Sequence, residues 1–97
     1  MKYSYMDYAN RLQKMIQCKT VSKKDSYDDA EFAKLREVMA ELFPLIHKQA
    51  KKLTFSDDCW MYCISGEDTS RNIMLMSHHD VVAADGEWKY DGFSGEI

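Results

Sequence analysis

Apolar side chains recur every three or four positions near the start of the chain, at Tyr5, Tyr8, Leu12, Met15 and Ile16. This spacing places them on one face of an α-helix. Ser4 followed three residues later by Asp7 resembles the capping pattern with which many helices begin. The pattern predicts an amphipathic helix over residues 5–18.

A second helical pattern follows a polar segment over residues 20–29, which we expect to form a loop. Its apolar positions are Phe32, Leu35, Met39, Leu42 and Phe43. Ser26 is a suitable residue type to cap the start of this helix. Pro44 lacks a backbone donor and should end or kink it, with residues 45–51 adding one or two further turns.

The period then changes to that of β-strands. Residues 53–55 and 59–65 predict two strands joined by a polar turn at 56–58. Both faces of the second strand are apolar, which predicts cover on both sides. Residues 73–76 are continuously apolar, so we expect residues 72–77 to form a strand buried in a mixed sheet. The predicted fold class is α/β.

Composition and charge narrow the class of protein. The chain has 97 residues, enough for one small domain or part of one, and its 13 basic and 16 acidic residues form no basic patch. We therefore expect no nucleic-acid partner. The sequence has neither a membrane-length apolar run nor the apolar stretch of a signal peptide. Three cysteines without metal-type spacing favour buried free thiols, and we expect a cytoplasmic protein.

The candidate chemistry lies where the expected buried strand ends, at Ser77-His78-His79-Asp80. Open α/β sheets build ligand sites at such strand ends. Side chains alternate along a strand, so His78 and Asp80 should share one side and His79 the other. A metal-bound histidine usually donates its second N–H to a carboxylate. We therefore predict that His78 is a metal ligand and that Asp80 is its carboxylate partner.

Two other interpretations of the motif are weighed against this one. A histidine at the end of a strand is often only a hydrogen-bonded surface residue, and a single His-x-Asp is common. A Ser–His–Asp triad is excluded, because Ser77 and His78 would face opposite sides of the strand and could not converge on a substrate.

The wider sequence resembles a known family. The run SHHDVV, then Trp88, then the final DGFSGEI, is similar in order and spacing to the HxDVVP, W and PFSGEI segments of a zinc metallopeptidase and amidohydrolase family. This family includes aminoacylase, carboxypeptidase S and acetylornithine deacetylase. Ala83 and Asp91 stand where the family usually or often has proline.

The upstream sequence resembles the same family. Its Thr20-Val21-Ser22 is similar to an early family segment. The residues that resemble the carboxypeptidase S branch are Phe32, Leu35, Leu42, Phe43, Pro44 and His47. The resemblance therefore covers nearly the whole chain.

The resemblance implies that His78 binds one ion of a two-zinc site, that Asp80 is its catalytic partner, and that His79 fills a variable position. It implies a zinc-dependent hydrolase that cleaves a peptide or N-acyl amino-acid amide by metal-activated water. The remaining ligands, the general base and the lid domain would follow Ile97. We expect residues 1–97 to be the N-terminal part of a single catalytic α/β domain, inactive alone.

The alternative is a non-catalytic structural or interaction module. Apolar strands without neighbours leave unpaired edges, and such edges recruit other chains. This hypothesis expects a homo-oligomer formed through sheet edges. Zinc-dependent hydrolysis would distinguish the two hypotheses.

Overall fold

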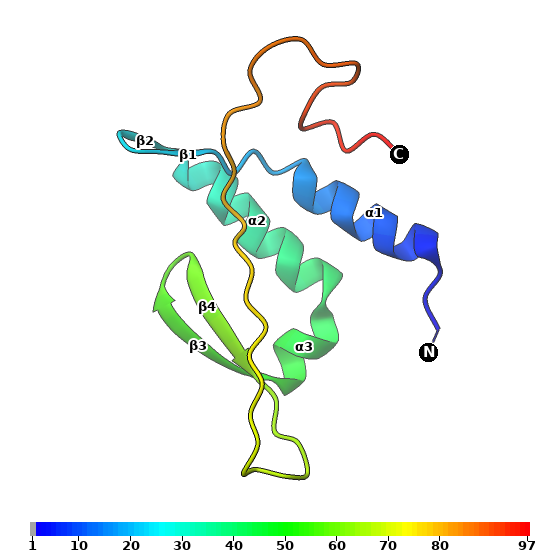
Figure 1. The fold of residues 1–97 in the computed structure, drawn as a ribbon, viewed down its shortest axis with the longest axis vertical. Coiled ribbons are helices and arrows are strands. Elements are labelled where there is room, and N and C mark those ends of the chain that lie inside the picture. The colour runs from blue at the N-terminus through cyan, green and yellow to red at the C-terminus, as the bar shows by residue number, and fades with distance from the viewer. Residues whose placement is uncertain (1) are drawn as a thin grey trace.

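The computed structural model describes residues 2–97, which form three helices and two small antiparallel sheets. In chain order the elements are α1 (Tyr5–Ile16), β1 (Ser22–Lys23), β2 (Ser26–Tyr27), α2 (Asp29–Leu42), α3 (Pro44–Gln49), β3 (Lys51–Ser56) and β4 (Cys59–Cys63). Figure 1 shows α1 beside α2, and the β3–β4 hairpin turning back along α2 after α3. The mixture of helix and strand agrees with the predicted α/β class.

The first helix begins as the sequence predicts. Ser4 Oγ accepts from the Asp7 amide, and Asp7 Oδ2 accepts from the Ser4 amide at 2.7 Å, which completes a capping box. α1 ends at Ile16, two residues before the predicted end. None of its residues is fully buried, and Tyr5 is 94% exposed. The helix therefore lies on the surface and contacts α2 with one face only.

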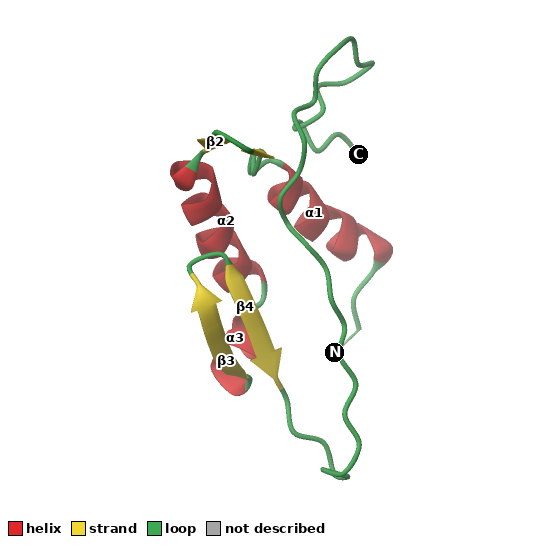
Figure 2. Ribbon diagram, turned by 60° about the vertical axis from the view of Figure 1, so that its left-hand side comes forward, coloured by secondary structure: helices red, strands yellow, loops and turns green. Residues whose placement is uncertain are grey.

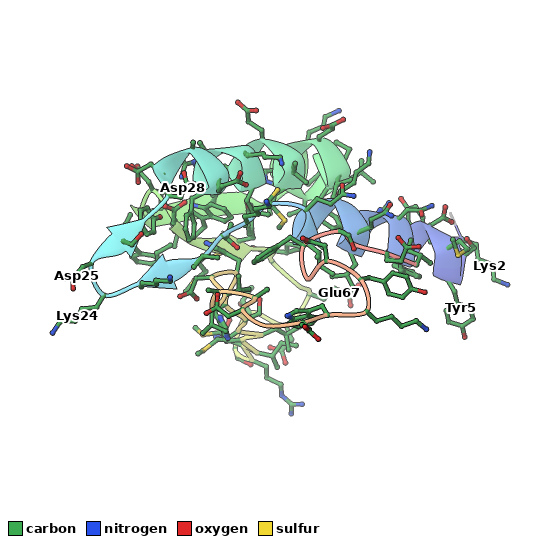
Figure 3. All side chains as sticks on the ribbon, turned by 90° about the horizontal axis from the view of Figure 1, so that it is seen from above. Lys2, Tyr5, Lys24, Asp25, Asp28 and Glu67 are labelled. Atoms are coloured by element: carbon green, nitrogen blue, oxygen red, sulfur yellow. The ribbon has the colours of Figure 1, made fainter. Side chains whose placement is uncertain are left out.

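The predicted loop and cap before the second helix are wrong in detail. Residues 22–27 form a small hairpin, in which Ser26 pairs with Lys23. The cap of α2 is Asp28, whose Oδ1 accepts from the amides of Ala30 and Glu31. Ser26 cannot cap α2 because it belongs to strand β2, and Tyr27 of the same strand separates it from the cap position at Asp28. Figure 3 shows Lys24 and Asp25 projecting from the hairpin tip and Asp28 at the start of α2.

The expected effect of Pro44 is confirmed. α2 ends at Leu42, and α3 begins at Pro44. Proline is well tolerated at the first helical position, because the amide it lacks would have no partner there. The hairpin that follows is also confirmed, with Leu53 opposite Met61 in an antiparallel register.

The cover predicted for the second hairpin strand is only partial, since no residue of the strand is fully buried. Cys59 and Cys63 are exposed, and Trp60 is only half-buried. In the part of the chain that the structure describes, β3 and β4 form a two-stranded sheet that no other strand joins. Of the three cysteines only Cys18 is buried, and burial raises the pKa of its thiol. The prediction of buried thiols therefore holds at this position alone.

The strand predicted at residues 72–77 is absent. This segment is an extended coil, and the side chains of Ile73 and Leu75 are each 91% exposed. Figures 1 and 2 show it running along the length of the molecule without a partner strand. The apolar side chains of this segment are of the type that is usually buried, but no strand within residues 2–97 pairs with its backbone. The predicted burial therefore fails here.

The fully buried apolar residues are Cys18, Phe32 and Leu35, and Thr20 is the buried polar residue beside them. They lie where the end of α1 meets α2 and the segment before β1. This small core holds the segment that contacts the candidate site. No helix within residues 2–97 has the length and apolar character required to cross a membrane.

A polar contact between the β1–β2 hairpin and the β3–β4 turn makes the stability of the fold depend on pH. The Tyr27 hydroxyl donates to Asp58 Oδ2, and Arg36 Nη1 lies 2.5 Å from Asp58 Oδ1. Desolvation of Tyr27, followed by its hydrogen bond to Asp58, raises the pKa of Tyr27 to about 12 from 10.0. A tyrosine whose pKa is higher in the folded state than in the unfolded state stabilises the fold at pH values below its unfolded-state pKa. This contribution to the free energy of unfolding is lost as the pH rises through about 12.

We expect Asp58→Asn to lower the pKa of Tyr27 toward its ordinary value, because the substitution removes the negative charge that opposes tyrosinate. Ultraviolet titration of tyrosinate, with Tyr27→Phe to identify the late-titrating group, measures the shift. Identical titration curves for the wild type and Asp58→Asn would contradict this assignment.

Candidate metal-ligand site

Two segments that are far apart in sequence meet at the candidate site. The Thr20 hydroxyl donates to the His79 carbonyl at 2.6 Å, and the Val81 amide donates to the Thr20 carbonyl at 2.9 Å. The Ser22 amide donates to the Val81 carbonyl at 3.1 Å, which completes a parallel bridge between Val21 and Val81. These bonds fix the backbone of the motif although no strand forms before it.

His78 and Asp80 lie together on the outer side of this backbone. His78 Nδ1 is 3.0 Å from Asp80 Oδ1 and 2.9 Å from the Asp80 carbonyl oxygen. A carbonyl oxygen can only accept, so Nδ1 carries the hydrogen. In neutral His78 this leaves the lone pair on Nε2, for which the structure shows no hydrogen-bond partner within residues 2–97. The side chain is 85% exposed, so a ligand can reach it.

His79 points the other way, into the body of the protein. Its ring stacks on Trp60 of β4, with centroids 5.1 Å apart and planes at 28°. It also meets Phe32 of α2 edge-on at 5.9 Å. Aromatic pairs of this kind contribute about 0.5–1.5 kcal/mol each beyond the area they bury. The structure therefore separates the two histidines of the motif as the alternation predicts, and His79 is a packed residue.

The residues present can supply one ligand to a metal ion. Within residues 2–97 no three histidine, cysteine, aspartate or glutamate side chains lie close enough to hold a metal ion. His78 presents its unprotonated nitrogen outward, and Asp80 already accepts the hydrogen of the other ring nitrogen. This donor set fits a shared site to which other residues contribute, and it does not fit a complete site.

The loop after the motif packs on α1. Gln17 Nε2 donates to the Ser94 carbonyl at 3.0 Å, and Gly95 has φ +68° with its Cα against Gln13. A Cβ at Gly95 would lie 2.7 Å from Gln13 Cγ, so only glycine fits this approach. Trp88 donates its ring N–H to the Asp85 carbonyl and is 60% exposed.

Two positions, one beside the site and one where the later loop meets α1, were not identified from the sequence. Thr20 appeared only within a polar segment and as part of a family-like segment, and nothing in the sequence distinguishes its buried hydroxyl from the other polar side chains there. Gly95 stands in a polar run where a positive φ cannot be recognised from one sequence. A pocket of about 260 Å³ beside Trp88 is lined by residues of this loop and includes neither His78 nor Asp80.

Comparison with known proteins gives three similar sequences. Two are Dictyostelium discoideum proteins named Probable carboxypeptidase S-like 2 and Probable carboxypeptidase S-like 1, which are 34% and 29% identical over 97% of this chain. A Saccharomyces cerevisiae protein provisionally named a carboxypeptidase is 35% identical over 68% of this chain. The chain spans about a fifth of the length of the first two relatives and 12% of the third. No family model and no solved structure matches the chain.

The buried hydroxyl of Thr20 provides a test of the site's support. We expect Thr20→Val to destabilise the fold by about 1–3 kcal/mol, because the His79 carbonyl loses its donor while the shape of the side chain is kept. Urea denaturation measures the change. Thr69→Val, at an exposed position, is the matched control and should stay within about 0.5 kcal/mol of the wild type. Equal stability of the two variants would show that the bond from Thr20 does not hold the motif.

Proposed function

Because the chain is related to the carboxypeptidase S-like proteins, we propose that it supplies the zinc ligand His78 to an α/β zinc hydrolase. The hydrolase would cleave a peptide or N-acyl amino-acid amide bond. One observation carries the proposal: His78 is exposed and directed outward, with its Nδ1–H held by Asp80. The relatives' names support the carboxypeptidase class, and the family resemblance of the motif adds the zinc.

Asp80 determines which nitrogen of His78 is available. The Nδ1 hydrogen is shared between the Asp80 backbone carbonyl and its carboxylate, which together fix the tautomer that leaves Nε2 unprotonated, and the carboxylate makes this nitrogen more basic. Both effects strengthen a bond from Nε2 to a metal ion. Zinc ions bound in a hydrolase polarise the substrate carbonyl and lower the pKa of a bound water. In this proposal Asp80 acts through His78, and its catalytic contribution is the orientation and charge that it gives to that ring.

The proposal requires ligands beyond the described residues. A catalytic zinc ion typically has about three protein ligands and a water. His78 is one such group, and no cluster of three exists within residues 2–97. We therefore propose that the second zinc ion, the general base and the groups that bind the substrate carboxylate belong to a longer protein. The length of the relatives, about five times that of the matched stretch, supports this arrangement.

A second candidate function is favoured by the exposed segment 72–77. Its backbone is unpaired, and its apolar side chains Ile73, Met74, Leu75 and Met76 are 64–91% exposed. An extended apolar segment with free amides and carbonyls is a template for strand pairing. We propose that the isolated chain self-associates through this segment, either in place of catalysis or because its neighbours in the longer protein are missing.

The zinc proposal is tested in a chimera in which this chain replaces the matching stretch of the 34% identical Dictyostelium relative. We expect His78→Ala to reduce the bound zinc by one ion and to abolish hydrolysis of dipeptides and N-acyl amino acids, because that ion loses one of few ligands. Asp80→Asn should weaken zinc affinity or activity by about 10–100-fold. Elemental analysis and steady-state kinetics measure both effects.

The matched control in the chimera is Asp25→Asn, which removes a carboxylate at the exposed tip of the β1–β2 hairpin. It should leave zinc content and kinetics unchanged. Unchanged zinc stoichiometry in His78→Ala would overturn the ligand assignment. If Asp25→Asn and Asp80→Asn were equally active, the carboxylate of Asp80 would have no role through His78.

Self-association is tested on the 97-residue chain alone. We expect concentration-dependent oligomers that the double substitution Ile73→Glu and Leu75→Lys weakens, because charged side chains oppose close pairing of apolar strands. Light scattering after size-exclusion chromatography measures the mass. Tyr5→Lys removes an equally exposed apolar side chain on α1 and should leave the oligomers intact. A monodisperse monomer at all concentrations would exclude this candidate function.

A further inference from the structure

We propose that His79 is a positioning residue for the neighbouring His78 and Asp80. Its ring, held between Phe32 and Trp60, turns the other two side chains outward. The inference rests on the proposed function, in which His78 is a zinc ligand, and it assigns a role to the histidine that the family resemblance leaves variable.

The side chain of His79 is the one by which this part of the chain packs against the rest of the protein. His79 is half-buried, whereas all the remaining side chains of residues 64–82 are exposed. Its two ring partners come from different elements, Phe32 from α2 and Trp60 from β4. Phe32 is itself fully buried and stacks on Tyr27. The ring therefore rests against one core residue, Phe32, and against the half-buried Trp60 of the hairpin.

The backbone restraint and the ring restraint act on the same residue. Thr20, which is buried, donates its hydroxyl to the His79 carbonyl, and its carbonyl accepts from the Val81 amide. In extended backbone successive side chains project to opposite sides. With the His79 ring held inward, His78 and Asp80 must both project outward, which brings Nδ1 within 3.0 Å of Oδ1.

The role assigned to His79 depends on a flat ring and not on a charge or a metal bond. Phenylalanine keeps a flat aromatic ring that can meet Phe32 and Trp60. Alanine removes both contacts and leaves the backbone bonds alone to hold the motif. His79→Phe should therefore rescue what His79→Ala loses. If His79 were itself a metal ligand, both substitutions would reduce zinc binding in the chimera equally.

The test measures the tautomer of His78 in the metal-free 97-residue chain by ¹⁵N NMR of the imidazole nitrogens. At about pH 8 an ordinary histidine is neutral. We expect the wild type and His79→Phe to hold His78 with its hydrogen on Nδ1. In His79→Ala the tautomer ratio should shift to that of an unstructured histidine peptide. An unchanged ratio in His79→Ala would overturn the inference.

A second pair of variants covers the case in which His79→Ala fails to fold. Trp60→Leu removes the stacking partner without altering the motif and should shift the His78 tautomer in the same direction. Trp88→Leu, which replaces a tryptophan in the later loop, is its matched control and should leave the ratio unchanged. Far-UV circular dichroism verifies that the helices remain. A shift in both tryptophan variants, or in neither, would contradict a specific role for the His79 contact.

The two proposals fail in different ways. The tautomer measurement is made without metal, so it tests the positioning of His78 independently of zinc. A held tautomer in the wild type that disappears in His79→Ala supports positioning even where the chimera binds no zinc, a result that would overturn only the ligand role. Zinc binding that depends on His78, with a tautomer insensitive to position 79, would overturn only the positioning role.

Discussion

The hydrogen bond from the Thr20 hydroxyl to the His79 carbonyl connects the part of the chain that has a core to the part that carries the chemistry. The core residues Cys18, Phe32 and Leu35 all precede β3. The motif follows an extended coil with no strand partner within residues 2–97. Without this bond and the adjacent Val21–Val81 bridge, only the His79 ring would connect the motif to the core within residues 2–97. A hydroxyl is well suited to this role, since its hydrogen bond to the His79 carbonyl offsets the cost of removing both groups from water.

The features that sequence analysis predicted well are governed by neighbouring residues. The capping box at Ser4, the break at Pro44 and the β3–β4 hairpin each follow from chemistry within a few positions. The cap of α2 was misplaced by two residues because Ser26 and Asp28 are both good capping residues. Only the structure distinguishes them, because Ser26 pairs with Lys23 in the hairpin and Asp28 accepts from the first amides of α2. Local rules identify an element well and its boundary less well.

The failures have a different physical origin. The apolar run at residues 73–76 indicates that these side chains are suited to burial, but the pattern does not identify the neighbouring element that would bury them. Alternation predicted correctly that His79 faces away from His78, since period two is a property of the backbone. It could not predict the rings of Phe32 and Trp60, which come from other elements. The roles of His78 and Asp80 as metal ligand and partner stay predictions, now with a defined hydrogen bond between them.

Gly95 couples two parts of the chain that no regular element joins. Its Cα approaches Gln13 so closely that a side chain on either the loop or α1 limits what the other can hold. Because α1 buries no residue of its own, this contact and the Gln17–Ser94 bond are among its attachments to the rest of the molecule. Sequence drift on the inner face of the first helix is therefore not independent of drift in the final loop. A bulkier residue at position 13 would have to be matched by a retreat of the final loop, whereas position 95 stays restricted to glycine by its positive φ and by the backbone of Gln13.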